Sequence, residues 1–156
     1  MDIKELRETD DFSQLFHLSK LFFKEYSNTH EFFFQIDVLH EEQVINYFRN
    51  FIDQQNKKVF IANEGNKIVG YIAVYFKEQA DFWKIKTVGD ISGLMVNPEF
   101  RRKGIAKLLL EEAKRFLREN NVKYCTLFTS TNNYGALKFY EKCGFSPLHL
   151  NLLTKT

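Results

Sequence analysis

The chain has 156 residues, of which 44% are apolar and 27% are charged, and its formal net charge is +2. This composition excludes an intrinsically disordered chain and suffices for the core of one domain, which we expect to span residues 1–156. The near-balance of charge gives no whole-protein reason to expect a nucleic acid or an anionic membrane as a partner.

Cysteine and histidine are too sparse to indicate a cross-linked or metal-binding protein. The two cysteines have neither a disulfide-framework nor a metal-ligand spacing, and the four histidines show no ligand spacing either. The charged first residues lack the apolar core of a signal peptide, and no apolar run is long enough to cross a bilayer. We therefore expect a cytoplasmic protein with reduced thiols, no metal and no membrane partner.

The first half of the chain predicts a short strand, two helices and a hairpin. The strand is "DIKELR", and apolar residues recur at helical spacing over residues 11–26 and 41–55. The runs "KVFIA" and "KIVGYIAVYF" are rich in β-branched and aromatic residues. They flank "NEGN", a turn signal, and so predict two antiparallel strands.

The second half predicts strands that alternate with helices. A strand runs from about Asp90 to Val96, a long helix follows Gly104, and "KYCTLFT" is a short apolar strand. "YGALKFYEKCGF" reads as a short helix that Gly144 ends, and "LHLNLL" suits a last strand. The order predicts an α/β (α+β) fold with a mixed, mostly antiparallel central sheet flanked by helices.

The start of the long helix carries an unusual concentration of positive charge. Cations are unfavourable there because the helix dipole already places partial positive charge at an N-terminus. The arrangement becomes favourable when an anion binds the free backbone N–H groups. The local pattern predicts either a solvated basic turn or, equally, a phosphate-binding cradle. The residues of this cradle are Arg101, Arg102, Lys103, Gly104, Ile105 and Ala106.

Two motifs, one after the other along the chain, resemble those of the GNAT superfamily of acyl-CoA-dependent N-acyltransferases. The family's signature Arg/Gln-x-x-Gly-x-Gly/Ala is matched by Arg101, Gly104 and Ala106. A later motif is matched by Asn133, Ala136, Tyr140, Gly144 and Phe145. The clear resemblance covers residues 91–145, whereas the first half of the chain is compatible with the family but less specific. Neither a P-loop nor a Rossmann fingerprint is present.

The resemblance implies a GNAT-like fold with acetyl-CoA as co-substrate and no metal. It implies that backbone groups near Leu94, Met95 and Val96 contact the pantetheine arm, beside a bulge at Gly93. The cradle would hold the pyrophosphate, and Asn133 would contact the cofactor arm, cap the following helix, or do both.

The resemblance also implies catalytic roles. Tyr140 would give a proton to the departing CoA sulfur, although without the motif it reads as a core aromatic residue. Asp90 is either the general base, acting directly or through water, or a solvated aspartate at the end of a strand. His30 and Glu31 are weaker candidates for the base. Cys143 lies where the family uses no nucleophile, so the amine is expected to attack directly within a ternary complex.

Three functions compete at this point. The leading one is an N-acetyltransferase acting on a primary amine, either a small molecule or a protein amine. A non-catalytic acyl-CoA-binding or sensing module is the alternative, and the retained Tyr140 argues against it. A nucleic-acid-binding domain is disfavoured by the near-neutral charge. The acceptor, the acyl-chain length and the oligomeric state stay open, with a homodimer among the options.

Overall fold

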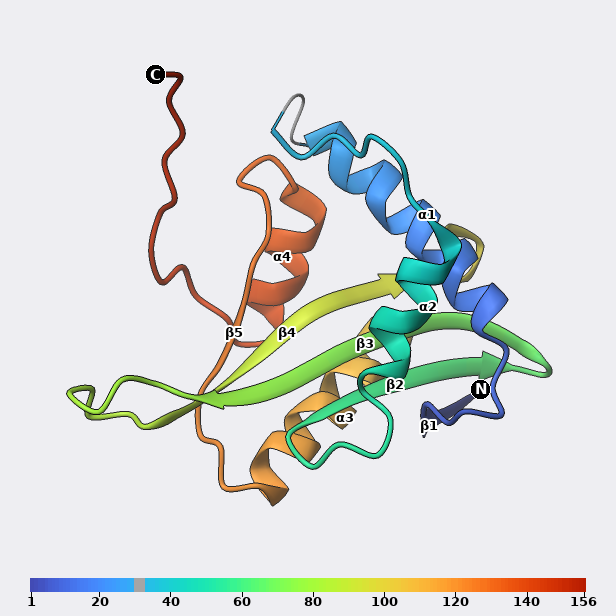
Figure 1. The fold of residues 1–156 in the computed structure, drawn as a ribbon, viewed down its shortest axis with the longest axis horizontal. Coiled ribbons are helices and arrows are strands. Elements are labelled where there is room, and N and C mark those ends of the chain that lie inside the picture. The colour runs from blue at the N-terminus through green and yellow to red at the C-terminus, as the bar shows by residue number, and fades with distance from the viewer. Residues whose placement is uncertain (30–32) are drawn as a thin grey trace.

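The computed structural model describes residues 1–29 and 33–156, and it contains a five-stranded sheet with helices on both faces (Figure 1). The elements in chain order are β1 (Asp2–Glu5), α1 (Phe12–Thr29), α2 (Glu41–Arg49), β2 (Lys57–Glu64), β3 (Lys67–Glu78), β4 (Thr87–Val96), the 3₁₀ helix η1 (Pro98–Phe100), α3 (Ile105–Glu119), β5 (Cys125–Leu127) and α4 (Tyr134–Lys142). The strands lie in the order β1-β2-β3-β4-β5; the first four are antiparallel, and β5 is parallel to β4.

Alternating side chains divide the core into two layers. On one face of the sheet, apolar residues of β2, β3 and β4 pack against α3, including Ile72, Ile91 and Leu109. On the other face, Ile61, Tyr71 and Met95 are among those that pack against α1 and α2. The region of α4 joins the first layer through Phe139, Cys143 and Phe145. Strands β2 and β3, at the centre of the covered region, are thus buried on both sides over much of their length.

Most of the predicted elements are confirmed, including the short N-terminal strand and the hairpin. The hairpin turn contains Gly65, whose φ of 60° glycine adopts without steric cost. Helix α2 ends at Arg49, whereas the sequence pattern predicted a helix over residues 41–55. Within the described residues, no helix is long and apolar enough to cross a membrane.

The predicted last strand, "LHLNLL", is wrong. Residues 146–156 form no strand, and they run away from the sheet as an extended segment (Figure 1). Leu148, Leu150 and Leu152 alternate as strand residues do, but each remains at least three-quarters exposed. Alternation alone predicted the strand, whereas strand formation also requires a neighbouring backbone with free hydrogen-bonding groups.

The sheet changes character along β4. Strand β4 pairs with β3 over its whole length but with β5 only from Gly89 to Ile91. A register shift lies opposite Ala73 and Val74, where β4 contains the extra residue Ser92 between Ile91 and Gly93. Such a bulge increases the local twist of a strand. This bulge lies at the level where β4 and β5 cease to pair.

We expect Gly70→Ala to destabilise the fold by about 1–3 kcal/mol, because the added Cβ would overpack the contact between β3 and β4. That Cβ would lie 2.8 Å from the backbone oxygen of Met95, an atom that cannot easily move aside. Gly135→Ala in α4 is the matched control, since its Cβ would meet nothing within 4 Å. Urea unfolding of both variants tests this, and equal stabilities would contradict it.

Candidate active site

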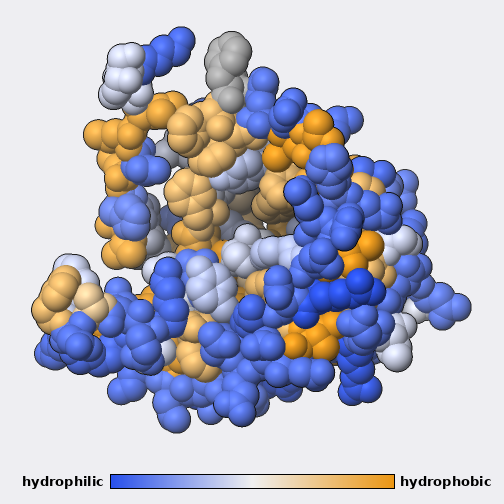
Figure 2. All heavy atoms as spheres, viewed as in Figure 1, coloured by the Kyte–Doolittle hydropathy of each residue, from blue (hydrophilic) through white to orange (hydrophobic). Residues whose placement is uncertain are grey.

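The separation of β4 from β5 creates an opening in the middle of the sheet. From Ser92 to Val96, one edge of β4 has no strand beside it, and β5 ends at Leu127. We call this gap the β4–β5 opening; it is flanked by α4 and by the end of α1 (Figure 1). Figure 2 shows that the surface is hollowed in this region and that apolar side chains border it. Leu94, Met95 and Val96, the predicted pantetheine contacts, lie on this edge.

The cradle lies at the far end of the same strand edge and has the geometry of an anion site. Arg102 has a φ of 63° and Gly104 a φ of 80°, so the backbone turns twice through the left-handed region. The first hydrogen bond of α3 runs from the Leu108 N–H to the Gly104 oxygen. In the described part of the chain, the backbone N–H groups of residues 102–107 therefore have no acceptor. Successive free N–H groups at a helix N-terminus favour a bound anion.

Arg101 is not free to screen that anion in this structure. Its Nε donates to the Val96 oxygen at 3.0 Å, and its Nη2 donates to both carboxylate oxygens of Glu25, at 2.7 and 2.9 Å. Lys103 lies over the Phe100 ring, and no contact of the Arg102 side chain is seen among the described residues. Glu25 of α1 thus neutralises one of the three crowded cations. No local sequence pattern predicted this pairing, because the two residues lie 76 positions apart.

Asn133 caps α4, as one of its two predicted roles requires. Its Oδ1 accepts a hydrogen bond from the Ala136 N–H at 3.2 Å. The loop before it is tied to the end of α1, because Ser130 donates from its hydroxyl to the Thr29 oxygen. The cap uses only the side-chain oxygen, which leaves the amide NH₂ of Asn133 available to a ligand.

Tyr140 is a half-buried residue of α4 that packs against aromatic neighbours. Its ring lies 5.3 Å from the ring of Phe139 and 5.7 Å from that of Phe145. Burial raises the pKa of Tyr140 to about 12, and the nearby Cys143 thiol adds to the shift. Within the described residues its hydroxyl has no hydrogen-bond partner. Tyr140 is therefore a protonated phenol over the whole physiological range, with its proton available.

Asp90 lies in a polar row that crosses three strands. Tyr75 of β3 and Thr126 of β5 are its partners in register. The Thr126 hydroxyl donates to Asp90 Oδ2 at 2.8 Å. Burial raises the pKa of Tyr75, and the charge of Asp90 and a hydrogen bond to it raise that pKa further. The flanking residues face α3, so this row faces the side of α1 and α2.

Tyr47 connects this row to α2. Its hydroxyl lies 2.8 Å from the hydroxyl of the bulge residue Ser92. Burial raises the pKa of Tyr47, the hydrogen bond with Ser92 lowers it, and the charge of Asp90 raises it. Asp90 was predicted from the sequence as a site residue, whereas Tyr47, Tyr75 and Thr126 were not. The hairpin register could have revealed Tyr75 as the residue opposite Asp90, whereas Tyr47 depends on helix packing.

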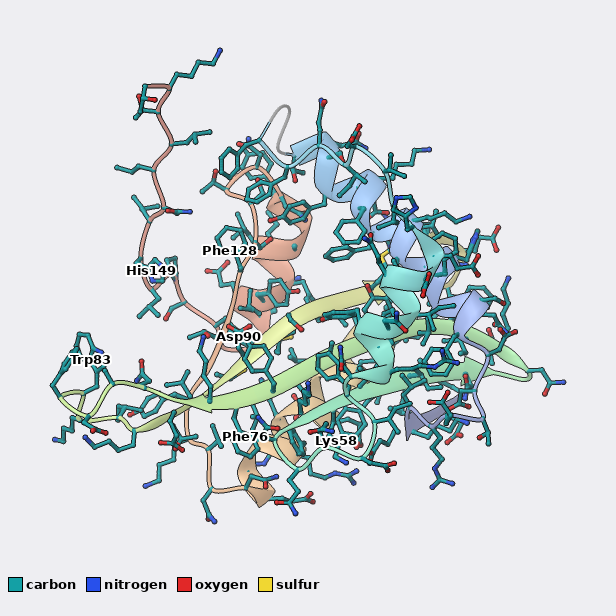
Figure 3. All side chains as sticks on the ribbon, in the orientation of Figure 1. Lys58, Phe76, Trp83, Asp90, Phe128 and His149 are labelled. Carbon is teal, nitrogen blue, oxygen red and sulfur yellow. The ribbon has the colours of Figure 1, made fainter. Side chains whose placement is uncertain are left out.

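An aromatic cluster borders the opening on the α1 side. Phe34 packs against Phe33 and, at 6.4 Å between ring centroids, against Phe128, which follows β5. Figure 3 labels Phe128 and Asp90, which both lie near the opening. The weaker base candidates His30 and Glu31 lie outside the described residues. Among the described residues, no group of three metal-ligating side chains is found.

Residues 12–145 match the Acetyltransferase (GNAT) family. The chain belongs to this family. An uncharacterized N-acetyltransferase of Archaeoglobus fulgidus is 34% identical over 100 residues, which are 64% of this chain and 67% of that protein. The chain spans less than half of two further relatives that it matches.

Solved structures show the same fold. The tetramutant of the BH1408 protein from Bacillus halodurans superposes with a TM-score of 0.85 at 18% identity, over all of both chains. The aminoglycoside N-acetyltransferase AAC(6')-Iy, in complex with CoA, superposes with a TM-score of 0.78 at 17% identity, over 99% of this chain and 93% of that one. The family assignment and these neighbours identify an acetyltransferase with a mixed sheet flanked by helices.

We expect Gly104→Val to weaken binding of acetyl-CoA at least tenfold, because a branched side chain would occupy the space in front of the free N–H groups. The built Cβ of Gly104 meets nothing within 4 Å, so the fold leaves that space open. Titration calorimetry measures the affinity. Gly65→Val is the matched control, since Gly65 also has a positive φ and open surroundings but lies in the β2–β3 turn. Equal affinities in the two variants would remove the cradle from the site.

Proposed function

We propose that the protein transfers the acetyl group of acetyl-CoA to a primary amine within a ternary complex. The run of unpartnered backbone N–H groups at residues 102–107, at the end of the free edge of β4, carries the proposal. A pyrophosphate on those groups would place the pantetheine arm along Leu94, Met95 and Val96. The thioester would then reach the β4–β5 opening, with α4 on one side and the Asp90 row on the other.

The chemistry requires one bond to form and one to break. The neutral amine nitrogen attacks the thioester carbonyl carbon, the C–S bond breaks, and the amine loses a proton. Asp90, on the acceptor side of the sheet, was expected from sequence to receive that proton directly or through water. Cys125 is a poor nucleophile, because burial raises the pKa of its thiol to about 12 and the charge of Asp90 raises it further.

The raised pKa of Tyr140 refines its proposed part in this step. An ordinary thiol has a pKa of ~8.5, so complete proton transfer from a phenol with a pKa of about 12 to a CoA thiolate would be uphill. Donating a hydrogen bond to the developing negative charge on sulfur has no such cost. We therefore assign Tyr140 the role of a donor that stabilises the departing thiolate, which takes its proton later from solvent.

Acetyl-CoA should stabilise the protein against heat, because a ligand that binds only the folded state adds about 2.7 kcal/mol at one hundred times its Kd. For a chain of this size, that energy corresponds to a rise in Tm of roughly 5–10 °C. Melting curves with acetyl-CoA, CoA and ATP measure it. A shift as large with ATP as with acetyl-CoA, or no shift with any of them, would contradict the proposed co-substrate.

Tyr140→Phe should lower kcat roughly 10- to 100-fold, the value of one hydrogen bond to a charged group, while acetyl-CoA affinity changes little. The wild-type rate should show no alkaline loss attributable to Tyr140 below about pH 11, since its phenol keeps its proton there. Steady-state kinetics from pH 7 to pH 10.5 measure both effects. Tyr124→Phe, at an exposed tyrosine before β5, is the control. A Tyr140→Phe enzyme within twofold of wild type, with chemistry limiting turnover, would leave Tyr140 a packing residue.

A further inference from the structure

The polar row beside the β4–β5 opening contains a carboxylate without a cationic partner. Asp90 is half-buried, and its neighbours in the row are the hydroxyls of Thr126 and Tyr75. Within the described residues, no lysine, arginine or histidine comes within ion-pair distance of it. Neutral donors hold the carboxylate in place but leave its charge uncompensated. A cation bound there would offset the cost of partly burying that charge.

Aromatic side chains lie beside the same carboxylate, and such rings suit an organic cation. Tyr75 hydrogen-bonds to Asp90, and Tyr47 lies close enough for the charge of Asp90 to raise its pKa. Phe128, two residues beyond Thr126, is 57% exposed. Aromatic rings attract ammonium groups through their faces and also shield the attached methylene groups from water.

We propose that this row is an acceptor subsite that selects amines carrying a second amino group. The second group, protonated, binds Asp90 between Tyr47 and Tyr75. The first amino group, uncharged, attacks the thioester in the β4–β5 opening and loses its proton to water, because an Asp90 that holds an ammonium does not serve as the general base expected from sequence. This inference rests on the proposed function, because it names the class of acceptor that the same site would use: an aliphatic diamine or polyamine.

The ionisation of the two amino groups favours this assignment over direct binding of the reacting nitrogen. A carboxylate next to the reacting amine would stabilise its protonated form, which has no lone pair for attack. An ammonium held at Asp90 occupies the carboxylate and offsets its charge, so the carboxylate no longer stabilises a proton on the nitrogen at the other end of the acceptor. The subsite therefore anchors the acceptor by its non-reacting end.

The test compares acceptors that differ only in the second amino group. Rates of thiol release are measured with 1,4-diaminobutane and with butylamine, and then with the three- to six-carbon diamines, for wild type and Asp90→Asn. We expect wild type to favour the diamine over the monoamine by roughly 10- to 100-fold in kcat/KM, as a charged hydrogen-bonded pair would give. In Asp90→Asn this ratio should fall to about one, mainly through a higher KM for the diamine.

The controls separate this inference from the proposed function and from a general loss of fold. Asp81→Asn removes a carboxylate from the exposed β3–β4 hairpin and should keep the wild-type ratio. Calorimetry with CoA-saturated protein should show the same preference for 1,4-diaminobutane, and its loss in Asp90→Asn, independently of turnover.

Two results would overturn the inference. One is a wild-type enzyme that treats the diamine and the monoamine alike. The other is an Asp90→Asn enzyme whose kcat falls equally for both acceptors while their ratio is kept, which is the behaviour of a lost general base. If acetyl-CoA binds but no amine in the panel releases thiol, the proposed function fails instead, and the calorimetric preference still decides whether the subsite binds diamines.

Discussion

The loss of pairing between β4 and β5 is the constraint on which the remaining architecture depends. A parallel pair needs a crossover, and α3 provides it, so the N-terminus of α3 must begin close to the end of β4. The bulge at Ser92 lies at the level where the pairing with β5 stops. The same short stretch of chain therefore leaves one edge of β4 unpaired and places the N-terminus of α3 close to the end of β4. An elongated ligand with a terminal anionic group matches both features together.

The electrostatics of the cradle follow from that arrangement. Crowding Arg101, Arg102 and Lys103 at the positive end of α3 is unfavourable unless an anion binds there. Glu25 offsets part of this repulsion, and the pair is about half exposed, so its contribution to stability is small. Its larger effect is geometric, because it fixes Arg101 against Val96 and leaves the backbone, rather than that side chain, to meet an anion.

The sequence was most informative where the physics is local. Hydrophobic periodicity predicted both N-terminal helices and the hairpin, and the glycine at position 104 together with the free helix start predicted the cradle. It was least informative about contacts between distant segments: Glu25 with Arg101, and Tyr47 with Ser92, depend on helix packing that no local pattern encodes. The predicted strand over "LHLNLL" shows the same limit, because alternation describes a strand's two faces but not the partner that must lie beside it.

Helix α1 links these separate parts into one frame. Near its end, Glu25 binds Arg101 at the cradle, while the backbone oxygen of Thr29 accepts a hydrogen bond from Ser130 in the loop before α4. The two contacts lie on opposite sides of the β4–β5 opening, so α1 spans it. A shift of α1 would then alter the positions of the cradle and of the loop that carries Asn133. Under the proposed function, acceptor specificity and cofactor binding are therefore expected to vary together, because α1 contacts both sides of the opening.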